Sequence, residues 1–364
     1  MKTYLLFCLF VFLSLTACGG KQDGPIATAV SPTDSAVSDV AEEGVVVEDE
    51  QETAVPEPTE TTSAGQLYYV VLTPGSQELV RHDVDTDATS TLFTVPTNGW
   101  LANMDVSHDG KQIVMAYAPP PEDNGIQFGY SNLYVMLADG QSEPRELIPR
   151  ENPEEILFNP IWSPLSTMIY YSHVTPTDPD SFAFDLTLER VNFVTGEVEI
   201  LAENGIWPRV SVDNRYLAYI HSNPENQANA LMLMELDRMT VTELVPETAF
   251  QAMDAPLFSA DGQTIYFSAA DNVDASRPWW DVLFGVETAV AHTLPSDWWK
   301  VSIDDPTPER LTTLDEVGLY ADLSLDGQTI AFAAQGGLYR MNPDGSGVEK
   351  WVEETLTDAL AWRR

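Results

Sequence analysis

Few residues of this 364-residue chain have the types and spacing that catalysis needs. The sequence contains no Gly-x-Ser-x-Gly elbow, no His-Glu-x-x-His pair, no phosphate-binding glycine loop and no close pair of cysteines. Asp83, Asp85 and Asp87 have the alternating spacing that opens a calcium loop, but the mid-loop Gly is missing and the twelfth position is Thr94. We therefore interpret this stretch as a turn between strands, and we expect no cofactor.

Histidines are the remaining candidates for metal binding. His173 and His221 each lie ten residues after a serine that recurs along the chain. Equivalent positions in neighbouring repeats would bring both rings to one rim, where a carboxylate such as Asp178 could complete a metal site. Repetition of an ancestral strand end explains the spacing as well, and we favour this simpler explanation.

Aromatic residues are concentrated near residue 290. A stripe of apolar residues recurs there at three- and four-residue steps, as on one side of a short helix: Trp279, Val282, Leu283, Val286 and Val290. We predict a helical insertion over about residues 271–297. Exposed aromatic side chains often dominate recognition or stack on sugars, so the candidate binding residues are Trp279, Trp280, Phe284, Trp298 and Trp299. The alternative is that this stripe packs onto the rest of the fold as a cap.

The elements that would position these residues belong to a repeat. The stretches FSADGQTIYFSAA (258–270) and LSLDGQTIAFAAQ (323–335) are nearly the same. With three further copies they form an array aligned on Ser107, Ser163, Ser211, Ser259 and Ser324. Each copy ends a short strand at the serine, turns through Asp, Gly or Asn, and continues as an alternating strand. Four antiparallel strands in a unit of about 40 to 50 residues are typical of a propeller blade.

The repeated phrase also carries a family resemblance. Ser-x-Asp-Gly-x-x-Ile-x-Phe, followed by Leu-Tyr-x-Met and then Asp-Gly, resembles the WD-like repeat of TolB-like bacterial β-propellers over residues 66–364. The resemblance implies an all-β propeller fold. It does not imply one function, because propellers serve many unrelated tasks. In the TolB family an α/β domain precedes the propeller, whereas this chain has a segment of a different kind there.

The two ends of the array predict how the ring closes. Residues 67–96 resemble three strands of a blade without the opening strand, and the C-terminal TDALAWRR (357–364) resembles an opening strand. We therefore predict six four-stranded antiparallel blades, the first completed by the C-terminal strand, so that no sheet edge stays open. Five or seven blades are the alternatives.

The first 65 residues have the composition of an export signal and a tether. Residues 1–17 contain one Lys, the apolar run YLLFCLFVFLSL and small residues before Cys18, and such a run is too short to remain as a membrane span. Leu-Thr-Ala-Cys resembles the bacterial lipobox, which implies that Cys18 is lipidated and begins the mature protein. An ordinary signal with a chance Cys is the alternative. Residues 18–65 are acidic and almost without aromatics, so we predict a disordered tether.

The charge excludes some partners. The chain has 57 acidic and 17 basic residues, a formal net charge of −40, of which about −31 falls on residues 66–364. Nucleic acids and anionic lipid surfaces need clustered Lys and Arg, so we exclude both as ligands of the propeller. The charge favours basic partners, although solubility alone also explains it.

The long loops indicate where the protein binds. The connection after the second strand lengthens in blades two to five, from PPPEDNGIQFGYS at 119–131 to about 28 residues in blade five. Because strands alternate in direction, these loops should share one face. We expect a lipid-anchored, extracytoplasmic, monomeric propeller that binds a protein, peptide or glycan at the bacterial cell envelope. The alternative is a polysaccharide lyase or hydrolase, which would show His, Arg, Tyr and acidic side chains clustered at the channel mouth.

Overall fold

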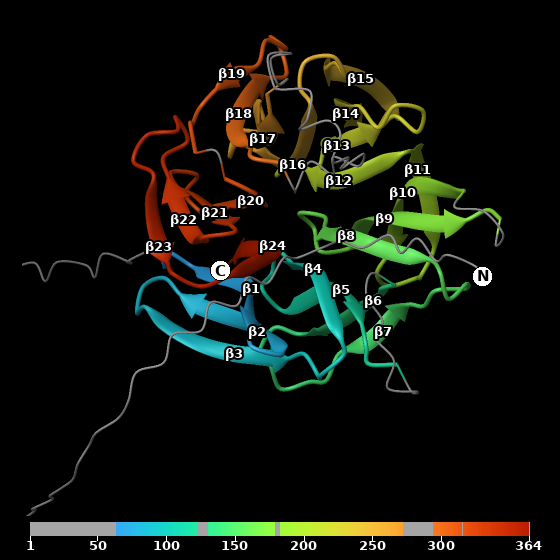
Figure 1. Ribbon diagram of the computed structural model, residues 1–364, viewed down its shortest axis with the longest axis vertical. Helices are drawn as coiled ribbons and strands as arrows, with labels where there is room; N and C mark the ends of the chain where they lie inside the picture. Colours follow the sequence, from blue (N-terminus) through green and yellow to red (C-terminus); the bar gives the residue numbers. More distant parts are fainter. Residues whose placement is uncertain (1–62, 122–129, 179–182, 272–293, 315, 364) are drawn as a thin grey trace, which may run out of the picture. The chain divides into compact units, whose positions relative to one another are not determined.

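The computed structural model describes residues 63–121, 130–178, 183–271, 294–314 and 316–363, and these form six four-stranded antiparallel sheets. Figure 1 shows the sheets arranged as a ring around a common centre. The predicted all-β, six-bladed propeller is thereby confirmed. The predicted signal and most of the predicted tether, including Cys18, lie outside the described residues. Among the residues that the structure describes, no helix is both long and apolar enough to cross a membrane.

Each blade runs from an inner strand at the centre to an outer strand at the rim. Blade one comprises β24 (Leu356–Arg363), β1 (Gln66–Thr73), β2 (Ser76–Asp83) and β3 (Ala88–Thr94). Blade two comprises β4 (Trp100–Val106), β5 (Gln112–Ala118), β6 (Asn132–Leu137) and β7 (Arg145–Ile148). Blade three comprises β8 (Ile156–Trp162), β9 (Met168–Pro176), β10 (Phe184–Asn192) and β11 (Val198–Glu203).

The second half of the ring follows the same order. Blade four comprises β12 (Gly205–Val210), β13 (Tyr216–Ser222), β14 (Asn229–Glu235) and β15 (Thr240–Val245). Blade five comprises β16 (Ala252–Phe258), β17 (Thr264–Ala270), β18 (Asp297–Ser302) and β19 (Glu309–Arg310). Blade six comprises β20 (Tyr320–Leu323), β21 (Ile330–Ala334), β22 (Gly337–Met341) and β23 (Glu349–Val352).

Ring closure depends on the last strand. β24 pairs antiparallel with β1, with Gln66 opposite Arg363 and Leu67 opposite Trp362. Figure 1 shows the red β24 beside the blue β1. The C-terminus therefore supplies the inner strand of blade one, as the sequence predicted.

The repeated serine holds the turn between the first two strands of blades two to six. Its Oγ accepts a backbone N–H five residues on, for example from Gln112 to Ser107 at 3.0 Å. In four of the five copies the hydroxyl also donates to the Asp two residues on at 2.6 Å: Asp109, Asp213, Asp261 and Asp326. This bond lowers the pKa of each of these carboxyls. The Ser-x-Asp phrase thus recurs because one side-chain pair closes the same turn in each of these blades.

Three inner strands carry a proline inside the sheet. In blades three, four and five a proline lies three residues before the serine, and the residue before it has a φ of +48°, +53° or +47°: Asn159, Trp207 and Ala255. The pairing register shifts at each of these sites. A β-bulge leaves a residue unpaired, so a proline there removes no ladder hydrogen bond. These bulges bend the inner strands where they line the centre of the ring.

The strand directions define two faces of the ring. The serine turns and the ends of β2 and β24 lie on one face, which we call the turn face. The connections between second and third strands lie on the opposite face, which we call the loop face. Because every blade repeats the same strand order, all the long connections predicted from the sequence leave the sheets on the loop face.

Candidate functional site

A buried charge cluster lies at the loop-face end of blade three. Nδ1 of His173, on β9, is 3.1 Å from Oε1 of Glu189 on β10, and its Nε2 is 3.7 Å from Oε2 of Glu155. Tyr171 donates its hydroxyl to the other oxygen of Glu189 at 2.6 Å. Glu155 precedes β8 and accepts the backbone N–H of Glu151 at 2.7 Å. We call His173, Glu155, Glu189 and Tyr171 the blade-three cluster.

The protonation of this cluster follows from its contacts. Burial disfavours the charged ring, but the hydrogen bond and charge of Glu189, together with Glu155, raise the pKa of His173 above its ordinary value. Burial also disfavours the Glu189 anion, but hydrogen bonds from His173, Tyr171 and Thr187 lower the pKa of Glu189. Both ring nitrogens face carboxylates, so the contacts are satisfied when the ring carries both protons. A ring in that state offers no lone pair to a metal.

Arg150 holds the neighbouring connection between blades two and three. Its Nε donates to Oδ1 of Asn132 at 2.7 Å, and its Nη1 donates to the carbonyl of Pro153 at 2.7 Å. Its guanidinium carbon lies 5.9 Å from the ring centre of Tyr130, which is 38% exposed. The loop face therefore presents an aromatic ring beside a fixed cation at this corner.

The centre of the ring is closed by ion pairs. Arg363, at the turn-face end of β24, places Nη2 2.7 Å from Asp105 and Nη1 2.6 Å from Asp322. Its Nε donates to the carbonyl of Val106 at 2.8 Å. All three charged side chains are at most 8% exposed. One guanidinium thus joins the inner strands of blades one, two and six.

A second arginine extends this network inside the ring. Nη2 of Arg209, on β12, donates to the carbonyl of Ala321 at 2.9 Å, and its Nη1 lies 3.8 Å from Asp322. Its guanidinium carbon lies 5.5 Å from the ring centre of Tyr320. Arg209 and Tyr320 also line a narrow space that has no room for a water molecule. Arg, Tyr and acidic side chains therefore converge at the centre, but they are buried and paired with one another.

We did not predict these central charged residues from the sequence, although their position within the repeat indicates them. Asp105, Arg209 and Asp322 all stand two residues before the repeated serine, in strands that are otherwise apolar. Charges of opposite sign at one repeat position indicate residues that meet where inner strands converge. Glu155 and Glu189 carry no such signal, because neither occupies a repeated position.

The predicted aromatic residues fall into two groups. Trp298 is fully buried and packs edge-on against Phe332 at 5.9 Å. Trp299 is partly buried between Phe250, at 4.7 Å, and the Arg310 guanidinium, at 5.6 Å. Both residues belong to β18, where Trp298 is buried in the core and Trp299 keeps part of its surface exposed. Trp279, Trp280, Phe284 and most of the predicted helical insertion lie outside the described residues, and the final residue of that range, Asp297, begins a strand.

The metal candidates do not come together in the described part of the chain. His173 is engaged by two carboxylates, and His221 lies on the neighbouring blade, on β13. Within the residues that the structure covers, no group of three or more His, Cys, Asp or Glu side chains is arranged to hold a metal ion. We therefore build no proposal on metal binding.

The aspartate-rich stretch forms a turn and holds the start of the propeller. Asp83 accepts the backbone N–H of Thr86 at 2.9 Å, as expected of a turn between strands. Asp85 accepts the hydroxyl of Ser63 at 2.6 Å and the N–H of Ala64 at 3.0 Å. The indole of Trp362 donates to the carbonyl of Ala64 at 2.8 Å. We call residues 63–65 the entry joint, which lies on the turn face.

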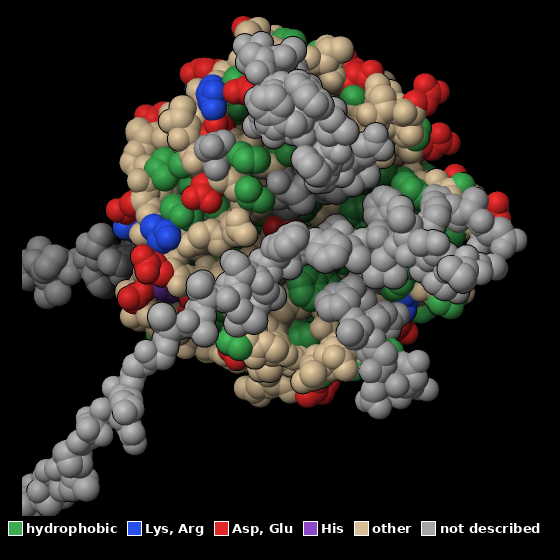
Figure 2. Space-filling view, in the orientation of Figure 1, with side chains coloured by type: hydrophobic (Ala, Val, Ile, Leu, Met, Phe, Trp, Pro, Cys, Tyr) green, Lys and Arg blue, Asp and Glu red, His purple; other side chains and the backbone are tan. Residues whose placement is uncertain are grey.

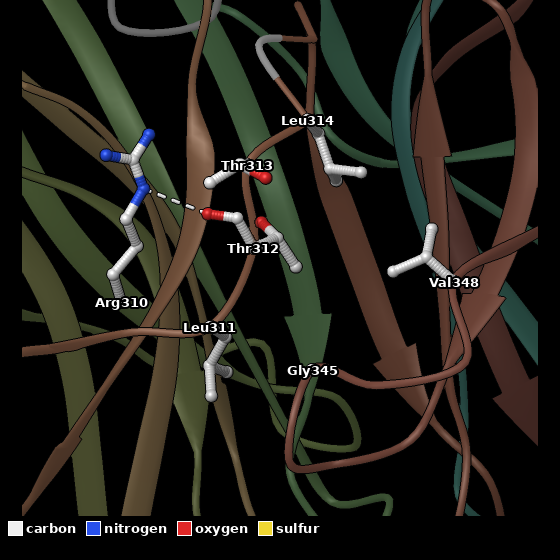
Figure 3. Close-up of a pocket in the computed structure, with 7 residues that line it drawn as sticks. All are labelled: Arg310, Leu311, Thr312, Thr313, Leu314, Gly345 and Val348. Carbon is white, nitrogen blue, oxygen red and sulfur yellow. Dashed lines mark hydrogen bonds between the residues drawn. The ribbon is translucent and has the colours of Figure 1, made fainter.

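The larger pocket has a volume of about 390 Å³ and lies between blades five and six. It is lined by Arg310, Leu311, Thr312, Thr313, Leu314, Gly345 and Val348. Figure 3 shows Arg310 on the side away from Leu314 and Val348, with its Nε bonded to the Thr312 carbonyl. The guanidinium also pairs with Asp271 at 2.9 Å and with Asp297. Among the described residues that line the pocket, the one charged side chain, Arg310, is therefore already neutralised within the protein.

Comparison with known proteins identifies the fold. Neither a protein-family model nor a curated protein matches the sequence. Among solved structures, TolB from Acinetobacter baumannii matches with a TM-score of 0.58 at 15% identity, over 82% of this chain and 66% of that one. This chain thus spans slightly less than two thirds of that protein. A putative TolB from Agrobacterium tumefaciens matches with a TM-score of 0.56 at 15% identity, over 82% of this chain and 98% of the other.

A further match lies outside the TolB proteins. A chain of a nidogen/laminin complex has a TM-score of 0.53 at 10% identity, over 82% of this chain and 98% of the other. Identities this low show the fold and leave the function open. The six closed blades, the repeated serine turn and these matches agree with the resemblance seen in the sequence: the chain folds as a six-bladed β-propeller similar to those of TolB proteins.

Proposed function

We propose that this protein is a lipid-anchored, extracytoplasmic propeller that binds a protein, peptide or glycan of the cell envelope through its loop face. This proposal rests on one observation, which is that the entry joint and the long connections lie on opposite faces of the ring. The chain enters through the entry joint on the turn face, whereas the long connections leave on the loop face. A lipid on Cys18 would then be joined to the propeller through the turn face, and this attachment would not occupy the loop face.

The closed centre supports recognition on the loop face. Arg363 and Arg209 lie inside the ring with their carboxylate partners, and all of these side chains are at most 10% exposed, so these charges are engaged within the protein. Elaborated loops on a rigid β scaffold are a common location of binding function. Figure 2 shows acidic side chains around the rim of the face in view and few basic ones. The acidic surface favours a partner with a basic contact region.

The side chains at the centre of the ring do not support the alternative function, a lyase or hydrolase. A lyase or hydrolase needs an acid or base within reach of its substrate. Asp105 and Asp322 are both bound to Arg363, and each also accepts a backbone N–H from the neighbouring blade, from Trp162 at 2.7 Å and Trp362 at 2.9 Å. Their carboxylates are therefore committed to holding the ring together.

Matched variants on the two faces test the proposal. The mature protein and two variants would be cross-linked in envelope preparations and the partners identified by mass spectrometry. One variant replaces residues 272–293, in the connection between β17 and β18, by a short Gly-Ser linker. The other, Leu165→Ser, changes a 69% exposed residue of the turn face. We expect the first variant alone to lose its partner, and loss in the second variant alone would refute the assignment of the face.

A further inference from the structure

The blade-three cluster joins three segments of chain that are separate in the sequence. His173 lies on β9, Glu189 on β10, and Glu155 on the connection that leads into β8. Both carboxylates are buried, since Glu155 is 5% and Glu189 is 7% exposed. The His173 side chain is 20% exposed, so protons reach it from solvent. Through the N–H of Glu151, Glu155 also holds the connection formed by residues 149–155.

The two contacts of the imidazole differ in strength. Nδ1 approaches Glu189 to 3.1 Å, which is hydrogen-bonding distance, whereas Nε2 lies 3.7 Å from Glu155 and 3.4 Å from the hydroxyl of Thr175. Because Nε2 makes the weaker contact, it loses its proton more readily than Nδ1 does. A neutral ring then keeps N–H at Nδ1 for Glu189 and turns the lone pair of Nε2 towards the Glu155 carboxylate. Two electron-rich groups would face each other in a buried site, which is unfavourable.

We propose that His173 is a proton-operated latch that fastens residues 149–155 to blade three when its ring is charged and releases them when it is neutral. Loss of the Nε2 proton turns Glu155 towards solvent and removes the acceptor of the Glu151 N–H. Arg150 still attaches the connection to β6 through Asn132. One corner of the loop face loosens while the sheet stays intact.

The direction of the pH dependence follows from the groups that face the ring. Glu189 comes from β10, Glu155 from the 149–155 connection, and Tyr171 and Thr175 from β9 itself. The pKa of His173 is raised in the folded protein, so the charged ring contributes its full stabilisation of the fold below the ordinary pKa of about 6.5. This contribution disappears as pH rises through the higher folded pKa. The pKa of Glu189 is lowered, so its stabilisation disappears only in acid, below the ordinary value of 4.5. The latch is therefore closed in mildly acidic solution and open in alkaline solution.

The latch affects recognition only if the proposed function is correct. The opened cluster carries one more negative charge on the loop face and frees a connection next to Tyr130 and Arg150. A partner that contacts this corner would then bind differently across the transition. The latch itself needs no partner, so the measurements below decide it independently of the proposed function.

The first test is the titration of the His173 ring by NMR in the mature protein. Its signal is assigned by its loss in His173→Gln. We expect a pKa above 6.5 for this ring. A value at or below 6.5 would overturn the proposal, because the two carboxylates would then not be holding a charged ring.

The second test measures hydrogen exchange of residues 149–155 at pH 6 and pH 9, corrected for the intrinsic pH dependence of exchange. We expect wild-type protection to fall several-fold at pH 9. His173→Gln should exchange rapidly at both pH values, because a neutral amide carries no positive charge to offset two buried carboxylates. His221→Gln, which changes the equivalent position of blade four, should retain the wild-type response.

Equal wild-type protection at both pH values refutes the latch, as does a wild-type pH response in His173→Gln. If His173→Gln does not fold, the wild-type exchange and ring titration decide.

Discussion

Replacing Arg363 with methionine should show how much the centre of the ring depends on one guanidinium. The variant keeps a long apolar side chain but leaves the carboxylates of Asp105 and Asp322 without their shared cation. Both residues are at most 5% exposed. Removing one partner from a buried ion pair typically costs about 3 to 5 kcal/mol, mostly as the penalty of the charge left behind. We expect the free energy of unfolding to fall by this amount, and Tm to fall by roughly 6 to 10 °C.

The pH dependence separates this mechanism from simple loss of packing. In the wild type, burial opposes ionisation of Asp322, but Arg363 and Arg209 lower its pKa, so this contribution to stability is present above about pH 3.8 and is lost only as pH falls further. Without Arg363, burial should raise the pKa of Asp322. The stability deficit of the variant should therefore be largest near pH 8 and smaller near pH 5, where protonation removes part of the buried charge.

Equilibrium urea unfolding followed by tryptophan fluorescence measures both effects. Arg238→Met is the control, because Arg238 is 71% exposed and its pairing with Glu235 is a surface ion pair. Such pairs contribute less than about 1 kcal/mol. The reasoning is refuted if Arg363→Met costs no more than Arg238→Met, or if its deficit is the same at pH 5 and pH 8.

Three further predictions follow from the fold and the anchor. Deletion of residues 357–364 should expose the edge of β1 and cause aggregation or loss of cooperative melting, and a monomer with unchanged Tm in light scattering and calorimetry would contradict this. Gly345→Ala should cost about 1 to 3 kcal/mol, because its Cβ would meet the Leu311 carbonyl oxygen at 2.4 Å, whereas Gly196→Ala, with no atom within 4 Å, should cost less in the same melting assay. Cys18→Ser should move the protein from the membrane to the soluble fraction, and unchanged fractionation would exclude the lipid anchor.

The sequence predicted those features that each repeat encodes locally. Ser107 and its equivalents mark the turns because the hydroxyl, the Asp and the strand start lie within five residues of one another. Closure by β24 was also predictable, because residues 357–364 copy the opening strand that blade one lacks. The ion pairs of Arg363 were not predicted, because Asp105 and Asp322 lie 258 and 41 residues away in sequence and meet it only in the closed ring.

The two adjacent tryptophans of blade five show a second reason why the sequence alone did not predict the structure. Trp298 and Trp299 directly follow the predicted insertion and were proposed as binding residues; in the structure they pair with Ser268 and Phe267 within the sheet. Neighbouring residues of a strand point to opposite faces, so two large rings in succession require both faces of the sheet to be covered. In a propeller every blade is packed between two others, and this explains why Trp298 is fully buried and Trp299 partly buried.

The last two described residues of β24 connect the entry joint to the centre of the ring. The indole of Trp362 holds the entry joint through Ala64, and its backbone N–H donates to Asp322. Arg363, the next residue, binds the same Asp322. A force applied along the chain before Ser63 would therefore reach the closing strand and the buried ion pairs within one or two contacts. Because these contacts fix the direction in which the chain leaves the ring, movement allowed by a tether would begin before the joint, and the loop face would keep its orientation relative to the joint.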